Sequence, residues 1–520
     1  MKSRWMTMIL LIPLISCNSF LDIEPENSVT FTNYFQNEAE VEALFTNILS
    51  TERKVFASVE PNIHDQIGLY CTDIYTSNTR ITDNIAGKLK MLDPAVFLHE
   101  SLDQSVSWKD YYDLIYLANM IIDNEFRFKN IQPERTKFWL AQAWFTKGLC
   151  YYTIARMWGD APIVPNSEFK QPLGKSPAKA VLEEALRCAK EALVLPAHDS
   201  PMMINAKGNE LTSKQYASLG TVYTLMANIY AWMGGLYGEN EYWREAEAAA
   251  SKVIEKEVGY YQLEPMATLC ENVLGNTRRS AETIFAIEIN AIDRNYFTES
   301  TTWHFAPGNY LITYPVMSDR ESDVVNQFGI LGDLKARIKS REVKSLYAES
   351  ADLRRSEFWK NLGAEENNGD DPYAYFYKWR KPIFSINAEA KRPYLGVEGN
   401  KIVWRLADLI LLRGECRARL GLATASEDLN AIRERAGLGK YAGSNDLRKE
   451  IFRERERELF GEGQRYDDAV RNGYLYELSP AFGELSASDI ERGALYLPIS
   501  KSAFTSNTLM RQNIYWSWKK

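Results

Sequence analysis

The sequence predicts a mostly α-helical fold in which tetratricopeptide-like helix pairs form a scaffold that carries one long irregular insertion. Apolar residues recur at helical spacing through most of the 520-residue chain, and long apolar helices lead through glycine turns into shorter alanine-rich ones. Residues 258–401 break this pattern with many Pro, Gly, Asn and Tyr residues. Hydrophobic residues at 45% and charged residues at 25% exclude a disordered or fibrous chain.

The N-terminal segment is predicted to be a lipoprotein signal peptide. Residues 1–16 combine a short basic stretch with an apolar run that is too short to cross a membrane. Ser16 precedes Cys17, and Leu14 lies two positions before Ser16, which is a lipobox pattern. We therefore expect lipidation at Cys17 and firm membrane anchoring by several acyl chains. An ordinary secretory signal with a chance cysteine, or the buried start of a domain, is the alternative.

The scaffold helices follow from apolar periodicity and from their boundaries. Pro133 favours the start of one helix, and Gly159 marks its end. Helices are expected at residues 38–50, 107–126, 134–158, 176–195, 211–232, 242–257, 403–420, 424–435, 445–460 and 464–472.

Two pairs of these helices have a similar build. YTLMANIYAWMGG leads into YWREAEAAASKVIE, and ADLILLRGECRARLGL leads into ATASEDLNAIRERAGL. Small alanine and glycine residues let paired helices pack closely. Each pair alone would expose an apolar face, so we expect the pairs to stack.

The domain organisation follows from the change in pattern. We expect a leader at 1–16, an N-terminal helical part at 17–257 and a C-terminal part at 258–520, joined in one compact unit. The insertion at 258–401 is expected to hold short strands, one of them at Glu282–Glu288, and no regular helices. Irregular segments of this length are usually functional.

Charge and cysteine content exclude several kinds of partner. Lys and Arg number 61 and Asp and Glu 69, so the net charge of −8 argues against nucleic acid. Four His and six Cys form no ligand cluster, so we expect no metal and no cofactor. Cys150 and Cys416 lie in apolar runs and are predicted to be small core residues, while a single disulfide elsewhere stays open.

The glutamates of the RERERELFGEGQR segment could be read as catalytic carboxylates. Glu454, Glu458 and Glu462 lie four residues apart on one helix face. We interpret them instead as structural ion-pairing residues, with Arg455 and Arg465 as candidate partners.

A series of motifs then occurs in a fixed order along the chain. They are the mature start CNSFLDIEP at 17–25, W-x-x-x-Y-x-x-I-x-x-x-N at 108–119, YYTIARMWGDAP at 151–162, R-x-A-D-x-x-L at 405–411, IRERAGL at 432–438, E-R-x-x-E-L with its following acidic and basic residues at 454–468, and the closing elements at 495–500 and 511–513. Together they resemble the SusD/RagB family of Bacteroidetes outer-membrane lipoproteins. Gly414 replaces the usual alanine, and the tail after Asn513 departs from the family pattern.

The resemblance implies a surface protein that captures glycans or other nutrients and delivers them to a SusC-like TonB-dependent transporter. It also implies that ligand loops come from two irregular regions, one between the first helices and one within the insertion. A helical-repeat adaptor without a small ligand is one alternative. A glycan-active enzyme is another, although no nucleophile elbow, zinc motif or phosphate loop is present and only the abundance of carboxylates leaves it open.

Aromatic residues in these regions are the candidate ligand contacts, because an aromatic face can stack on the apolar face of a sugar ring. Proline and glycine flank the aromatic residues near 303–314, which predicts an exposed loop, and we expect a second exposed loop near residue 359. Residues 373–379 alternate as a strand with one aromatic face, and packing against the scaffold is the alternative there. The predicted ligand contacts are Tyr75, Trp303, Tyr310, Tyr314, Trp359 and Tyr375.

Overall fold

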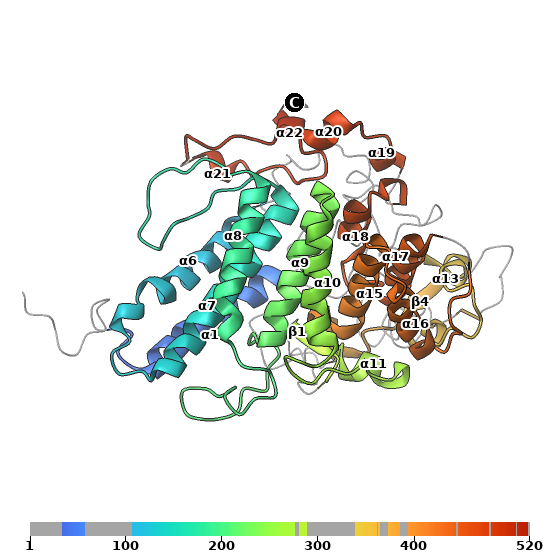
Figure 1. The fold of residues 1–520 in the computed structure, drawn as a ribbon, viewed down its shortest axis with the longest axis horizontal. Coiled ribbons are helices and arrows are strands. Elements are labelled where there is room, and N and C mark those ends of the chain that lie inside the picture. The colour runs from blue at the N-terminus through green and yellow to red at the C-terminus, as the bar shows by residue number, and fades with distance from the viewer. Residues whose placement is uncertain are drawn as a thin grey trace, which may run out of the picture.

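The computed structural model describes residues 34–57, 107–275, 280–288, 338–360, 362–363, 373–384, 394–443, 446–477, 480–505 and 507–517. Helices dominate this part of the chain, as predicted, and stand side by side across the molecule (Figure 1). The N-terminal scaffold consists of α1 (Glu38–Ala57), α6 (Lys109–Asp123), the 3₁₀ turn η3 (Glu125–Arg127), α7 (Pro133–Trp158), α8 (Ala178–Glu191), η4 (Ala192–Val194), α9 (Leu219–Tyr237) and α10 (Asn240–Ile254).

Neighbouring helices pack as antiparallel pairs. α7 contacts both α6 and α8, and α9 contacts α10 along most of its length. At Gly234 an added Cβ would lie 2.6 Å from the ring of Trp243, so glycine permits the close approach of α9 and α10. The predicted pairing of these two helices is confirmed.

The start of α9 differs from the prediction of a helix at 211–232. Ser218 caps the helix in a capping box with Thr221, so regular structure begins at Leu219. The preceding residues belong to a loop in which Ile204 and Glu210 form an isolated β-bridge. Between Leu211 and Ser218 the apolar residues are Leu211, Tyr216 and Ala217, a spacing that does not match one helix face.

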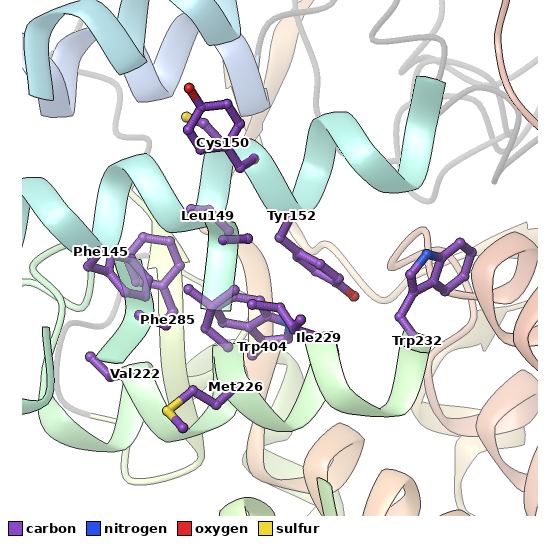
Figure 2. Close-up of a cluster of buried hydrophobic side chains, with 14 of the residues drawn as sticks. Phe145, Leu149, Cys150, Tyr152, Val222, Met226, Ile229, Trp232, Phe285 and Trp404 are labelled. Atoms are coloured by element: carbon purple, nitrogen blue, oxygen red, sulfur yellow. The ribbon is translucent and has the colours of Figure 1, made fainter. Parts of the chain in front are cut away.

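The main core lies where α7 and α9 meet a two-stranded sheet. β1 (Thr283–Ile287) pairs antiparallel with β7 (Lys401–Arg405), and Phe285 opposes Trp404. Figure 2 shows Phe285 and Trp404 together with side chains of both helices. The ring centroid of Phe285 lies 5.2 Å from that of Phe145 and 6.0 Å from that of Trp404. The predicted strand at 282–288 is therefore confirmed.

Beyond the sheet, a second set of helices continues the scaffold. It comprises α15 (Leu406–Arg419), α16 (Ala425–Arg435), α17 (Leu447–Glu458) and α18 (Arg465–Asn472). α15 packs on α16 as predicted, and also on α10, which links the two sets (Figure 1). The helix expected at 403–420 begins at Leu406, because residues 401–405 pair with β1.

The insertion holds short strands, as expected, but it also contains helices. The helices are α11 (Met266–Asn272), α13 (Ser340–Leu346) and α14 (Arg354–Glu357). The strands are β2 (Ile338–Lys339), β3 (Trp359–Lys360), β4 (Tyr373–Phe376), β5 (Lys381–Phe384) and β6 (Tyr394–Glu398), with β4 between β2 and β3, and β5 paired with β6. The expectation of an insertion without regular helices was wrong, because these helices are too short to give a clear periodic signal.

A cover of short helices closes one edge of the molecule, at the top of Figure 1. It consists of η7 (Leu475–Glu477), α19 (Pro480–Gly483), α20 (Ala487–Glu491), α21 (Ser502–Thr505) and α22 (Ile514–Ser517). Among the described residues, no helix has the length and apolar character needed to cross a bilayer.

The four cysteines of the described residues are all free and buried: Cys150, Cys188, Cys270 and Cys416. The prediction that Cys150 and Cys416 are core residues is confirmed, since both are fully buried. Burial raises the pKa of the Cys150 and Cys416 thiols, which keeps them protonated and unreactive.

Candidate functional site

A small cavity of about 60 Å³ lies where the N-terminal scaffold meets β7. Phe56 of α1, Tyr111 of α6, and Tyr152 and Arg156 of α7 line one side of it, while residues 401–404 and 462–464 line the other. Tyr152 and Trp404, two of the lining side chains, are visible in Figure 2.

The two regions expected to carry ligand loops join the described structure next to this cavity. The segment 58–106 follows directly after Ala57, one residue beyond Phe56 of the cavity wall. The segment 289–337 begins two residues after Ile287, which pairs with Lys401 of the same wall. Residues that are distant in the sequence therefore lead to one place on the molecule.

Charged side chains surround the cavity. Arg156 pairs with Asp467 at 2.8 Å, and Glu462 pairs with Arg405 at 2.8 Å. Burial lowers the pKa of the half-buried Lys401 to about 7. Since a water needs about 10–15 Å³ of such space, the cavity has room for about four waters but not for a sugar ring. It is therefore a small polar cavity where the scaffold meets β7 rather than a glycan pocket.

Glu52 lies one helical turn before Phe56 and is 1% exposed. Its carboxylate accepts hydrogen bonds from Thr146 Oγ1 and Gln215 Nε2, each at 3.1 Å. Burial raises the pKa of Glu52 to about 7, although both hydrogen bonds and the nearby Arg53 act to lower it. The end of α1 thus carries a carboxyl group that titrates near neutral pH.

The acidic face of α17 forms the centre of a buried ion-pair network. Glu454 accepts from Arg354 at 2.8 Å, and Arg354 also reaches Glu458 at 3.3 Å. Arg405 bridges Glu458 and Glu462, both at 2.8 Å. The prediction of structural ion pairing is confirmed, and these carboxylates are committed to cations rather than to catalysis.

The predicted partners of these glutamates were wrong. Arg455 points to the other side of α17, where it pairs with Asp408 at 2.6 Å and Asp468 at 2.7 Å. Arg465 pairs with Glu456. Glu454 pairs with Arg457 of the same helix at 2.6 Å, and the other partners come from the insertion, from β7 and from the end of α16, where Arg435 pairs with Glu458.

Sequence reasoning missed the basic side chains of this ion-pair network. Lys378 donates to the carbonyl oxygens of Glu458 and Phe460, at 3.0 and 3.1 Å, and is fully buried. The one signal that could have found this network is the single basic residue in the apolar run Val403 to Leu406, since a buried Arg needs a carboxylate partner.

Trp359 does not lie in an exposed loop, contrary to the prediction. It is 2% exposed, and its ring lies 5.0 Å from those of both Phe376 and Phe460. β3 pairs with β4 and turns this ring into a second, smaller core that also contains Trp379. Trp359 is therefore a core residue and is unavailable for stacking on a ligand.

Of the other predicted contacts, the backbone of Tyr375 is within the described residues and the remaining four are outside them. Tyr75, Trp303, Tyr310 and Tyr314 lie outside the described residues, as does Cys17. Of Tyr375 the structure gives the backbone, which pairs with Lys360. The described residues contain no group of three or more metal-ligating side chains.

Two sequence models match separate parts of this chain. One, described as "SusD family", matches residues 341–516, and the other, described as "Starch-binding associating with outer membrane", matches residues 19–224. The chain belongs to the SusD/RagB family. SusD-family proteins are binding proteins rather than enzymes, so this chain is a binding protein.

Individual SusD-family relatives align with this chain over nearly its whole length. SusD-like protein P25 of Formosa agariphila is 24% identical over 516 residues, which cover 90% of this chain and 89% of the relative. The crystal structure of a SusD homologue from Bacteroides thetaiotaomicron has a TM-score of 0.75 at 23% identity and covers 93% of this chain and 100% of its own. A laminarin-binding SusD-like protein has a TM-score of 0.68 at 20% identity, with coverages of 92% and 99%. These structures establish a shared fold.

Proposed function

We propose that this SusD-family chain is a cell-surface lipoprotein that captures a glycan and delivers it to a SusC-like TonB-dependent transporter in the outer membrane. Family membership supports the proposal, as do the description of one matching model as starch-binding and the laminarin binding of one relative of the same fold. The observation that supports it is that the described residues leading into segments 58–106 and 289–337, at the ends of α1 and β1, lie beside one cavity.

The proposed ligand contacts are the aromatic residues of these segments: Tyr75, Trp303, Tyr310 and Tyr314, together with Tyr375 of β4. Each ring would stack on a sugar face, and the tyrosine hydroxyls would bond sugar hydroxyls. Loss of one stacking ring is expected to weaken binding about three- to tenfold. Trp359 is excluded from this set by its burial.

Isothermal titration against laminarin and starch oligosaccharides, with a hydrolysis assay on the same panel, tests the proposed function. We expect saturable binding without hydrolysis and weaker binding by Trp303→Ala. Phe126→Ala is the matched control, because Phe126 is a highly exposed ring on the scaffold that lies outside both segments. If the wild-type chain binds no glycan of a broad panel but still co-purifies with a protein partner, the adaptor function is favoured instead.

Lipidation and the transporter are tested separately. Cys17→Ala should abolish acylation, which mass spectrometry and detergent partition report. Pull-down from detergent-solubilised outer membrane should recover a TonB-dependent barrel with the wild-type chain. Recovery of the lipoprotein alone, under conditions that preserve other outer-membrane complexes, would contradict the transporter partnership.

A further inference from the structure

The wall of the cavity at β7 carries two hydrogen-bond donors that no described residue satisfies. Tyr152 of α7 is 3% exposed, and its hydroxyl makes no hydrogen bond with any residue that the structure describes. Arg156 lies one turn further along α7, and its buried Nε has no hydrogen-bond partner among those residues. Buried polar groups in folded proteins are nearly always hydrogen-bonded, so two such donors on one wall indicate a site for a group that accepts hydrogen bonds.

The two donors are held close together by contacts within the protein. The guanidinium carbon of Arg156 lies 4.9 Å from the centroid of the Tyr152 ring, so the ring supports the guanidinium. Arg156 Nη1 lies 2.8 Å from the carboxylate of Asp467, and this ion pair fixes the distal end of the guanidinium while the Nε–H stays open to another acceptor. The positions of both donors therefore do not depend on a ligand.

The charged side chains of the cavity wall favour an anion over a cation or a neutral group. They are Arg156, Lys401 and Glu462, of which two are basic. Both carboxylate oxygens of Glu462 already accept hydrogen bonds from Arg405, each at 2.8 Å, so Glu462 is not open to a cation. Burial lowers the pKa of Lys401 to about 7, and an anion beside this side chain would favour its charged form. Water would satisfy the two donors but would not supply that negative charge.

The size and the apolar part of the cavity restrict the anion further. The volume of about 60 Å³ holds about four waters, which is close to the space that a carboxylate and the carbon next to it would fill. Phe56, Leu149 and Trp404 form the apolar part of the wall, and the last two are drawn in Figure 2. Apolar side chains suit the carbon of a carboxylate, whereas sulfate or phosphate would place a further oxygen against them.

We propose that this cavity binds a small carboxylate group, with Tyr152 and Arg156 donating to its oxygens from one side and Lys401 supplying positive charge from the other. Hydrogen bonds to an ionised acceptor are shorter and stronger than those to a neutral one, which gives the site its preference. The carboxylate belongs either to a free short-chain acid or to an acidic sugar whose ring stays outside the cavity. Only in the second case does the inference rest on the proposed capture of a glycan.

Acetate is the probe that tests the proposal, and acetamide is its neutral counterpart of similar size. The chain from Asn18 to Lys520, which keeps every described residue, is titrated with each compound at constant ionic strength, and saturation-transfer NMR reports binding. We expect saturable binding of acetate and binding of acetamide that is weaker by at least about tenfold. Tyr152→Phe and Lys401→Gln should each weaken acetate binding about tenfold, because each variant removes one hydrogen bond or charge that meets the anion.

Glucuronate and glucose distinguish the two sources of the carboxylate. If glucuronate displaces acetate and glucose does not, the site takes the carboxylate of an acidic sugar. If acetate binds and glucuronate leaves it in place, the site takes a free short-chain acid.

Matched variants outside the cavity wall are the controls. Tyr230→Phe removes the hydroxyl of another buried tyrosine, and Lys175→Gln removes another half-buried ammonium group. Both should bind acetate like the wild type, and thermal unfolding checks that every variant is folded. Absence of saturable acetate binding, equal binding of acetamide, or equal losses in wall and control variants would overturn the proposal. Binding of neutral glycans is measured separately, so none of these results would contradict the proposed function.

Discussion

Glu52 in the N-terminal scaffold and Glu415 in α15 are both 1% exposed, yet their carboxyl groups differ greatly in acidity. Burial dominates at Glu52 and raises its pKa to about 7. At Glu415 burial acts in the same direction, but Arg471 lies 2.6 Å away and lowers the pKa to about 2. Two glutamates that are equally buried therefore have opposite pKa shifts, because one lies in a mainly apolar interior and the other in an interior that holds a buried arginine.

The first interior is stabilised mainly by apolar packing between α7, α9 and the sheet (Figure 2). The second, around α15, α17 and α18, is stabilised by buried ion pairs with specific geometry, such as Arg455 between Asp408 and Asp468. Apolar burial tolerates exchange of similar side chains, whereas a buried charge becomes costly as soon as its partner is removed. The C-terminal part should thus be the more sensitive to single substitutions.

The largest expected effect is that of Arg405→Met. This change leaves Glu282, Glu458 and Glu462 without their shared cation, and should lower the free energy of unfolding by about 5 kcal/mol. Urea denaturation measures the loss, and hydrogen exchange should show opening of β7 and α17. Arg448→Ala is the control, because its ion pair with Asp446 is exposed and should contribute less than about 1 kcal/mol. Equal losses of unfolding free energy in Arg405→Met and Arg448→Ala would mean that the ion-pair network does not stabilise this region.

Phe285→Ala should cost about 3–4 kcal/mol, because it leaves a cavity between Phe145 and Trp404. Hydrogen exchange should increase first around α7, α9 and β1 rather than in α17. Phe285→Leu, which retains most of the volume, is the conservative variant and should cost less than about 1.5 kcal/mol. If hydrogen exchange in Phe285→Ala increased first in α17, the two interiors would not differ as described.

Glu52→Gln should stabilise the protein above neutral pH. The pKa of Glu52 is about 7 in the folded chain and near 4.5 when unfolded, so the wild type loses stability as pH rises through this window. The variant should therefore gain about 1–3 kcal/mol at pH 8 and show a flatter profile between pH 4.5 and 7, measured by thermal unfolding.

Glu415→Gln is the counterpart of Glu52→Gln and should change stability in the opposite direction. Because the pKa of Glu415 is lowered, its carboxylate contributes stability above about pH 4.5 and loses it as pH falls toward 2. The variant should be less stable than the wild type at pH 7. If both glutamine variants shift stability in the same direction, the two interiors do not differ as described.

The smallest effect is expected for Ser218→Ala, which removes the cap that starts α9. The loss should be about 1 kcal/mol in urea denaturation, because one backbone N–H at the helix end loses its acceptor. Ser486→Ala removes the equivalent group from the exposed box of the short α20 and should have less effect. A larger effect at Ser486 would show that burial of the cap is unimportant.

Local patterns predicted much of the scaffold. The helix from Pro133 to Trp158 and the strand at residues 283–287 follow directly from proline placement and apolar spacing. Spacing also indicated that Glu454 and Glu458 would form ion pairs. It could not name Arg354 or Arg405 as the partners, because these lie about 50 to 100 residues away and only the packing of the insertion brings them close.

The sequence by itself determined which side chains must be buried, where most helices run and which family motifs occur, because periodicity and caps act over a few residues. Tertiary structure alone decided that Trp359 enters a core, that residues 401–405 form a strand and that the ends of α1 and β1 lie beside one cavity. Aromatic residues in irregular segments suit a core and a ligand surface equally well in sequence. Only the distant elements that pack against them settle which of the two they form.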